Sequence, residues 1–511
     1  MKQYQKLTVT EQLAYRKRRE LWRKLNALGC ELDSWLARSE PNGPFEKHHT
    51  QIRAVRTHLG QWSQTVRSLV KKNLRGDTDA FLASIYNAER LILSEHRIWE
   101  FFRGKLVQRD EEGFRRYLAI ADEFAWACYS PIQAHVYADR ASPSCKEPPL
   151  VFFNGGTSPF SSSRGKDFKP EEVRIAGEDL SGRDIELASK LPIPVVGLPW
   201  HQIAHLPEAL VIGHEVGHLV EDDFGLTDGL QSLLLEGLAE AKAETRQGAW
   251  VKWLGEIFAD IYGCLSAGPA FVGALMDFLA RDYAEISFER KTEKDWSPYP
   301  TTYLRGLILL NVLEEMGFPD KVAGYRSLWD NFKSKMPREF SDDVPFIVRK
   351  LLNGNLIKST APGVPAASVK EIFCFSRAQQ DVVDRAVKLG TKMAVAGSDI
   401  RVLFATARAA YEVDPKTYIR ENYGAKILTH IEKNVIRRGI RRKELPLTFQ
   451  QIEEKLRGYE ESARSMVDEV LRESDASLLR IQADANDVVA GATDGSNAIQ
   501  PEQEKPSSAR G

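Results

Sequence analysis

The sequence has no long hydrophobic run and no excess of charge of either sign. No stretch approaches the roughly 20 apolar residues of a membrane-spanning helix, and the N-terminus lacks the continuous apolar core of a signal peptide. Its 511 residues include 70 Lys and Arg against 71 Asp and Glu, which gives a formal net charge of −1. This balance excludes a whole-molecule field that would attract nucleic acid or anionic lipid. We therefore expect a cytoplasmic protein with no membrane contact.

Cysteine is scarce, and glycine and proline are no more frequent than in an ordinary globular protein. The five cysteines stand singly, without a CxxC pair, so the chain is not a disulfide scaffold and we expect free, mostly buried thiols. With 35 Gly, 24 Pro and 43% apolar residues, the composition excludes a collagenous or broadly disordered chain. A globular protein of two or three domains is expected from this length.

Hydrophobic periodicity predicts a mainly α-helical protein with a small β-sheet, an α+β fold. Apolar residues recur at three- and four-residue spacing from about residue 10 to 123, and helical patterning resumes after Pro207. Two short apolar runs at 150–153 and 194–200 predict strands. The turn-rich residues that follow the first run are expected to form a mobile loop. The expected parts are a helical N-terminal domain, a catalytic domain, a helical C-terminal domain and a flexible tail, over 1–140, 141–350, 351–483 and 484–511.

The strongest motif is HEVGH at residues 214–218, in an apolar helical context. A helix places His214 and His218 one turn apart on one face, where both can bind one Zn²⁺. Glu215 can then accept the proton of a metal-bound water, whose pKa falls to about 7, and return it to the leaving amine. Gly213 and Gly217 would each cost about 0.5 to 1 kcal/mol in a helix, which close packing against another element would explain.

A third metal ligand is available downstream, in the segment WLGEIFADIYG. This segment supplies Glu256 on a second helical pattern, with Asp260 one turn later on the same face. Asp260 is suited to accept the second ring N–H of a ligating histidine, which fixes the tautomer of that ring. We therefore expect Asp260 to support the metal site without ligating.

HEVGH followed by EIFAD resembles the gluzincin branch of zinc metallopeptidases, the thermolysin-like group with HExxH and a downstream ExxxD. The resemblance implies a zincin-like core within residues 141–350, flanked by helical regions, and one Zn²⁺ per chain. It implies that His214, His218 and Glu256 bind the zinc, that Glu215 is the general base, and that Asp260 orients a ligand histidine.

Further features near the motif extend or limit this resemblance. The metzincin pattern is disfavoured because Phe224 stands where those enzymes have their third histidine. The segment YPTTYLR is similar to the HPPxxxR segment of some membrane-embedded gluzincins, with Tyr299 in place of the family histidine. We expect Tyr299 or Tyr303 to donate a hydrogen bond to the tetrahedral intermediate, and Arg305 to hold a substrate carbonyl or carboxylate. The run at 194–200 precedes the metal helix where zincins place the edge strand that pairs with substrate.

Three interpretations of HEVGH compete: an active zinc hydrolase, a zinc-bearing but inactive scaffold, and a chance helix. Glu215, together with Glu256 and Asp260 at helical spacing, favours a zinc metallopeptidase acting on a peptide or protein substrate. The alternative is an interaction or regulatory protein whose flanking helical regions bind a protein partner. Nucleic acid is not an expected partner, because the basic run at 433–443 has no interleaved aromatic residues and no binding motif.

Overall fold

The computed structural model describes residues 4–41, 43–73, 78–137, 145–164, 193–203, 205–280, 296–331, 338–389 and 399–436. Contacts divide the chain into two compact units. One consists of Met1–Leu25, Gln61–Leu93 and Glu461–Gly511, and the other of Asn26–Gly60 and Ser94–Glu460, which includes the HEVGH motif. The expected tail and most of the basic run lie outside the described residues. The domain boundaries expected from the sequence stay predictions.

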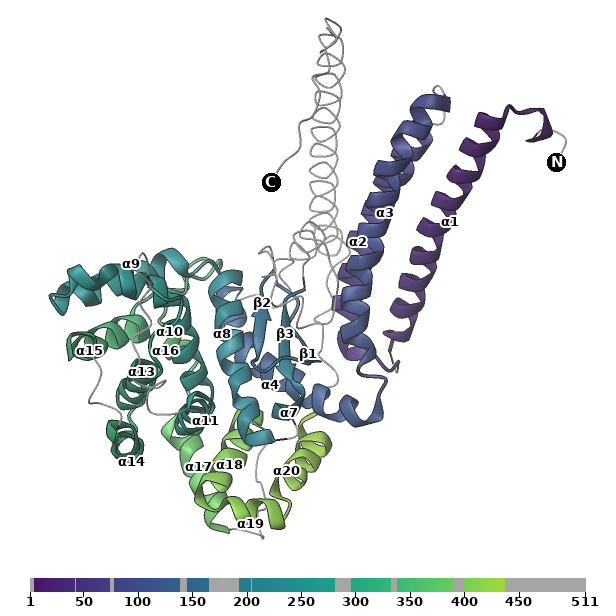
Figure 1. The fold of residues 1–511 in the computed structure, drawn as a ribbon. Helices are drawn as coiled ribbons and strands as arrows, with labels where there is room; N and C mark the ends of the chain where they lie inside the picture. The colour runs from purple at the N-terminus through teal and green to yellow at the C-terminus, as the bar shows by residue number, and fades with distance from the viewer. Residues whose placement is uncertain are drawn as a thin grey trace, which may run out of the picture. The chain divides into compact units, whose positions relative to one another are not determined.

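The described chain is mainly helical with one small sheet, which confirms the predicted fold class (Figure 1). The N-terminal helical pattern corresponds to α1 (Val9–Arg38), α2 (His49–Asn73), α3 (Thr78–Val107) and α4 (Glu112–Val136), with short 3₁₀ turns at Tyr4–Lys6 and Glu46–His48. All five cysteines are free, as predicted, but only Cys128 and Cys264 are buried. No helix in the described ranges has the length and apolar character needed to cross a membrane.

A three-stranded sheet lies beside the helices in the order β1-β3-β2 (Figure 1). β1 (Leu150–Asn154) runs parallel to β3 (Val195–Pro199), and both are buried along their whole length, which explains their continuous apolar sequences. β2 (Phe160–Ser162) runs antiparallel to β3 and places Phe160 opposite Gly197. A Cβ at Gly197 would lie 2.4 Å from the Phe160 ring, so glycine is required there.

This topology corrects one expectation from the sequence. The run at 194–200 was expected to form the edge strand, but it forms β3, the central strand of the sheet. The outer strand on the side of the helix that carries HEVGH is β2, which lies inside the segment expected to be a loop. β2 escaped prediction because it is only three residues long and has one apolar side chain, Phe160, too little for a period-two pattern.

Helices from the middle of the chain follow the sheet. Pro207 stands in the first turn of a 3₁₀ helix (Leu206–Val211) that leads directly into α8. The elements of this region are α7 (Trp200–Ile203), α8 (Ile212–Asp223), α9 (Thr227–Glu240), a 3₁₀ turn at Glu244–Arg246, α10 (Gln247–Ala267), α11 (Pro269–Leu279), α13 (Thr302–Glu315), α14 (Pro319–Trp329) and α15 (Arg338–Asn353). α8 lies between the sheet and α10 (Figure 1).

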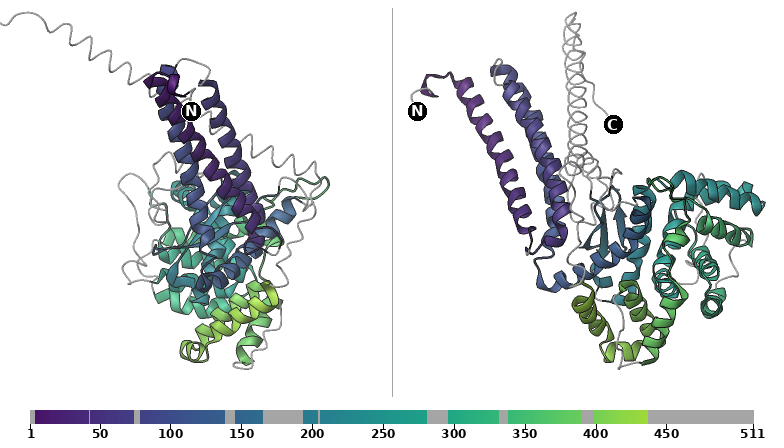
Figure 2. Two further views of the ribbon diagram at one scale, coloured as in Figure 1. Left: turned by 90° about the vertical axis from the view of Figure 1, so that its right-hand side faces the viewer. Right: turned by 180° about the vertical axis from the view of Figure 1, so that it is seen from behind.

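The last described helices close the core beneath α8 and α11. They are α16 (Val369–Ile372), α17 (Arg377–Leu389), α18 (Ile400–Val413), α19 (Pro415–Arg420) and α20 (Tyr423–Ile431), followed by a π-helical turn at Glu432–Ile436. α18 packs against α4, α10 and α11, and the rings of Phe124 and Phe404 stack at 4.3 Å. The last described helices, coloured light green, lie side by side in both views of Figure 2. One hydrophobic core therefore extends from α4 through α8 and α10 to α20.

Candidate metal centre

Helix α8 carries the HEVGH motif through the interior of the protein. Val216, Leu219 and Val220 are buried in the hydrophobic core. The rings of His214 and His218 lie one turn apart with their centroids at 4.9 Å and their planes at 90°. The helical spacing thus places both imidazoles on one face, as the sequence predicts.

Two glycines allow α8 to approach α10 more closely than larger residues would. A Cβ at Gly217 would lie 2.9 Å from the Cα of Ala259 and 2.9 Å from the Cβ of Tyr262. A Cβ at Gly213 would lie 2.5 Å from the Oγ of Ser266. All three distances are shorter than a side chain tolerates without movement of a neighbour. The glycines therefore bring the ligand-bearing faces of the two helices together.

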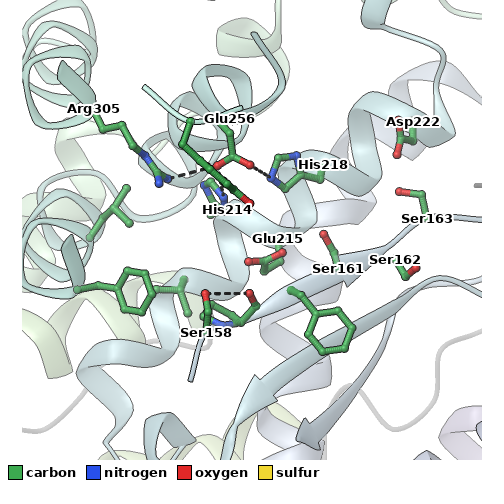
Figure 3. A pocket seen from close by; sticks show the side chains of 16 residues that line it. Ser158, Ser161, Ser162, Ser163, His214, Glu215, His218, Asp222, Glu256 and Arg305 are labelled. Carbon is green, nitrogen blue, oxygen red and sulfur yellow. Dashed lines mark hydrogen bonds and ion pairs between the residues drawn. The ribbon is translucent and has the colours of Figure 1, made fainter. Parts of the chain in front are cut away.

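His214, His218 and Glu256 converge at the junction of α8 and α10 (Figure 3). The Glu256 carboxylate faces both rings, with Oε2 at 3.5 Å from Nε2 of His214 and Oε1 at 3.5 Å from Nε2 of His218. A tetrahedral zinc with bonds of about 2.0 to 2.2 Å separates its ligand atoms by about 3.3 to 3.6 Å. The three side chains could therefore hold one metal ion, and no other such group of three occurs within the described ranges.

Asp260 contacts the other ring nitrogen of His214, on the side away from Glu256. Its Oδ1 lies 2.9 Å from Nδ1 of His214, and the carboxylate is completely buried. Burial alone would lower the pKa of His214, but the hydrogen bonds to Asp260 and Glu256 outweigh burial and raise it. Because the Asp260 carboxylate accepts a hydrogen bond from Nδ1–H of His214, the Nε2 atom of this ring is directed toward Glu256 and the candidate metal position.

The other two ligands hold the protonation states that a metal requires. Burial lowers the pKa of His218 to about 4, and the charge of His214 adds to this effect. Burial would raise the pKa of Glu256, but hydrogen bonding to His214 and the nearby positive charges outweigh burial and lower it. At neutral pH His218 is thus neutral and Glu256 is ionised, as zinc ligands must be.

Glu215 stands apart from the ligand cluster, on the wall of a cavity of about 290 Å³. Its side chain is buried and faces Ser161 of β2 (Figure 3). Burial raises the pKa of Glu215, whereas the charge of His214 and the hydrogen bond with Ser161 oppose this rise. A carboxylate with a raised pKa next to a metal position is suited to accept a proton and to give it back.

The cavity has walls of different character. Residues 158–163, which include β2, line one side and are mostly serine. Val211, Leu275 and Phe278 contribute apolar surface, and α8 and α10 contribute the metal-ligand cluster. The cavity therefore joins a polar strand edge, a candidate metal centre and an apolar recess.

The structure places the remaining candidate residues in different positions. Tyr299 lines the cavity and is 42% exposed, within reach of a bound substrate. Arg305 also lines the cavity, but its guanidinium donates to both carboxylate oxygens of Asp260 and lies 3.7 Å from Glu256. Tyr303 is 2% exposed, and it is not among the residues that line the cavity. Of the two tyrosines, Tyr299 therefore has the position of an oxyanion donor.

Sequence reasoning missed the residues of β2 and the groups that hold them. Ser161 faces Glu215, and Arg164 follows the strand and binds Asp223 at the end of α8. The sequence here has a single Phe among serines, followed by an arginine. This pattern is too weak to predict a strand. These contacts arise from tertiary packing between segments far apart in the chain.

Comparison with known proteins gives no match: the chain matches no family model, no curated protein and no solved structure. The gluzincin resemblance therefore depends on residues 214–218 and 256–260. The structure brings His214, His218 and Glu256 of these segments into one candidate metal cluster.

Proposed function

We propose that the protein is a zinc-dependent metallopeptidase of the gluzincin type, which hydrolyses peptide bonds with a glutamate general base. The observation that carries this proposal is the convergence of His214, His218 and Glu256, whose possible ligand atoms lie within 4.8 Å of one another on the wall of a cavity that Glu215 also lines. Two imidazoles and one carboxylate form a donor set that is typical of catalytic zinc, which keeps its fourth position for water or substrate.

Each residue has a distinct part in the proposed reaction. His214, His218 and Glu256 would hold the ion, which when bound acidifies water and polarises the scissile carbonyl. Glu215 accepts a proton from the attacking water and transfers it to the leaving amine. Tyr299 donates a hydrogen bond from its phenolic O–H to the carbonyl oxygen as negative charge develops there.

The proposed substrate is an extended peptide segment that adds to the outer edge of β2. Among the described strands β2 is the outer one on the side of α8, and residues 158–163 line the cavity. Backbone pairing with β2 would align the scissile bond along the metal centre, by the strand-addition mode of peptide recognition. The apolar surface of Val211, Leu275 and Phe278 would receive one substrate side chain.

Metal content is the first test, because it needs no substrate. Zinc is measured by plasma mass spectrometry in the wild-type protein and in His218→Ala after dialysis without chelator. We expect about one zinc per wild-type chain and little in His218→Ala, because two remaining ligands hold zinc weakly. Equal, negligible metal in both proteins would reject the metal centre.

Turnover is the second test. A library of unstructured peptides is incubated with the wild type and with Glu215→Gln, and new termini are read by mass spectrometry. We expect cleavage by the wild type and a loss of several orders of magnitude in Glu215→Gln with its zinc retained. Full activity in Glu215→Gln would reject the mechanism. Zinc without turnover, with partner binding unaffected by Glu215→Gln, would favour an interaction protein.

A further inference from the structure

A buried ion pair joins the end of the metal helix to the segment that follows β2. Nε of Arg164 lies 2.8 Å from Oδ1 of Asp223, the last residue of α8. The Asp223 carboxylate is completely buried, and the Arg164 side chain is largely so. Arg164 is separated from β2 by one residue, so this pair ties the strand directly to the helix that carries His214 and His218.

Further hydrogen bonds hold both Arg164 and Asp223 in place. The Tyr129 hydroxyl donates to Oδ2 of Asp223 at 2.6 Å, and Lys146 donates to the Asp223 carbonyl oxygen. Arg164 also donates from Nη2 to the carbonyl oxygen of Glu147 at 2.5 Å. Tyr129 of α4 and Lys146, from the segment before β1, thus both hold Asp223, while Glu147 holds Arg164, which gives the pair a defined position.

Within the described residues, the other contacts of β2 are few. The strand pairs with β3 over three residues, and at its start the Phe160 ring lies against Gly197 and, edge to face, against Phe152 at 5.8 Å. At its other end, the strand lies against α8, with Ser161 facing Glu215, and Arg164 adds the bond to Asp223. Short outer strands open readily when few bonds secure them.

From these contacts, we infer that Arg164 and Asp223 form a latch that sets the distance between β2 and the metal centre and so positions extended peptides for cleavage. This inference rests on the proposed peptidase function, and Arg164 acts as a positioning residue, since it does not line the cavity. Ser161 connects the latch to the proposed chemistry, because it lies on β2 and faces Glu215 across the cavity wall.

Hydrogen exchange tests the latch without any substrate. Arg164→Met removes the charge and keeps most of the side-chain stem. We expect amides 160–163 to exchange about tenfold faster or more, with exchange in α8 and zinc content unchanged. Arg164→Lys restores the charge but cannot bond Asp223 and Glu147 together. Its exchange rate at amides 160–163 should therefore lie between those of the wild type and Arg164→Met. Asp223→Asn, which preserves shape, provides a second variant if Arg164→Met folds poorly.

Kinetics then test positioning. For an eight-residue peptide that pairs with β2, we expect Arg164→Met to raise KM about tenfold or more with kcat within about threefold of wild type. A blocked dipeptide, too short to pair with β2, should be cleaved equally by both proteins. Arg246→Met is the matched control, because it breaks the ion pair with buried Asp343, whose members do not line the cavity.

The possible outcomes separate the latch from the peptidase. Unchanged exchange at residues 160–163 in both Arg164→Met and Asp223→Asn would overturn the latch and leave the peptidase proposal intact. An equal rise in KM for Arg246→Met would also overturn it, because general destabilisation would then explain the effect. Absence of turnover in the wild type would reject the peptidase, whereas the exchange experiment would still decide whether Arg164 fixes β2.

Discussion

The guanidinium of Arg305 donates two hydrogen bonds to the carboxylate of Asp260, from Nη2 to Oδ1 at 2.7 Å and from Nε to Oδ2 at 2.8 Å. Asp260 in turn bonds Nδ1 of His214 through the same Oδ1. A chain of contacts therefore runs from α13 through α10 to the ligand face of α8. Such outer contacts fix the ring orientation and basicity of a metal-ligating histidine.

Replacement of Arg305 by Met should weaken zinc binding by about 10- to 100-fold, because Asp260 would lose the partner that fixes it behind His214. The variant should also be less stable by about 3 to 5 kcal/mol, since a buried carboxylate would lose its charge partner. Chelator competition measures the zinc affinity, and urea unfolding measures the stability. An unchanged zinc affinity with a raised KM would restore Arg305 to the substrate-binding role expected from the sequence.

Gly217→Ala should separate α8 from α10, because the new Cβ would lie 2.9 Å from the backbone of Ala259. Such overpacking costs about 1 to 3 kcal/mol, and the moved helices would also misplace the metal ligands. We expect a lower unfolding free energy together with a reduced zinc content. Gly324→Ala is the control: this exposed glycine in α14 has open space around it, and alanine should stabilise the helix by about 0.5 to 1 kcal/mol. Retention of full zinc binding in Gly217→Ala would contradict the role of close helix approach.

The metal-ligand cluster could be predicted from the sequence because its information is local. His214 and His218 share a helix face by their spacing alone, and Glu256 and Asp260 do so on a second helix. The structure places His214, His218 and Glu256 within one cluster and Asp260 behind His214, as expected. The close packing expected from Gly213 and Gly217 is likewise present between α8 and α10.

Features that depend on tertiary contacts could not be predicted in this way. β3 reads as a single apolar run, and whether it is central or at the edge depends on β2, whose sequence carries no strand pattern. Arg305 and Tyr303 are both placed by α13, and the sequence did not show that one binds Asp260 while the other is buried. Asp260 lies 45 residues from Arg305 in the chain, beyond the reach of local spacing.

Zinc binding should release a proton from His214. The hydrogen bonds to Asp260 and Glu256 raise the pKa of His214, so the metal-free ring stays protonated above its ordinary titration range and must lose the Nε2 proton to bind zinc. Zinc affinity should therefore keep rising with pH beyond 6.5. Calorimetry at pH 7.5 in buffers of different ionisation enthalpy measures the protons released.

The comparison variant for this titration is Asp260→Asn. An asparagine carries no charge, so the pKa of His214 should fall and the ring should already be neutral at pH 7.5. The wild type should release about one proton more than the variant, because ionisation of zinc-bound water contributes equally to both. Equal proton release from the two proteins would show that Asp260 does not set the protonation of His214.

Two tyrosines on the same segment give a direct test of the oxyanion donor. Tyr299 lines the cavity and is partly exposed, whereas Tyr303 is buried outside the cavity lining. Loss of one hydrogen bond to a developing oxyanion lowers kcat by about 10²- to 10³-fold. Tyr299→Phe should therefore lower kcat by up to this amount, with KM and zinc content close to wild type.

Tyr303→Phe serves as the matched control, since it removes the same hydroxyl four residues away. Because that hydroxyl belongs to a side chain that does not reach the cavity, kcat should stay within about twofold of wild type. The opposite pattern, a large loss in Tyr303→Phe with Tyr299→Phe active, would require the segment around α13 to turn during substrate binding. Full activity in both variants would instead leave stabilisation of the oxyanion to the metal, with Tyr299 confined to the rim of the cavity.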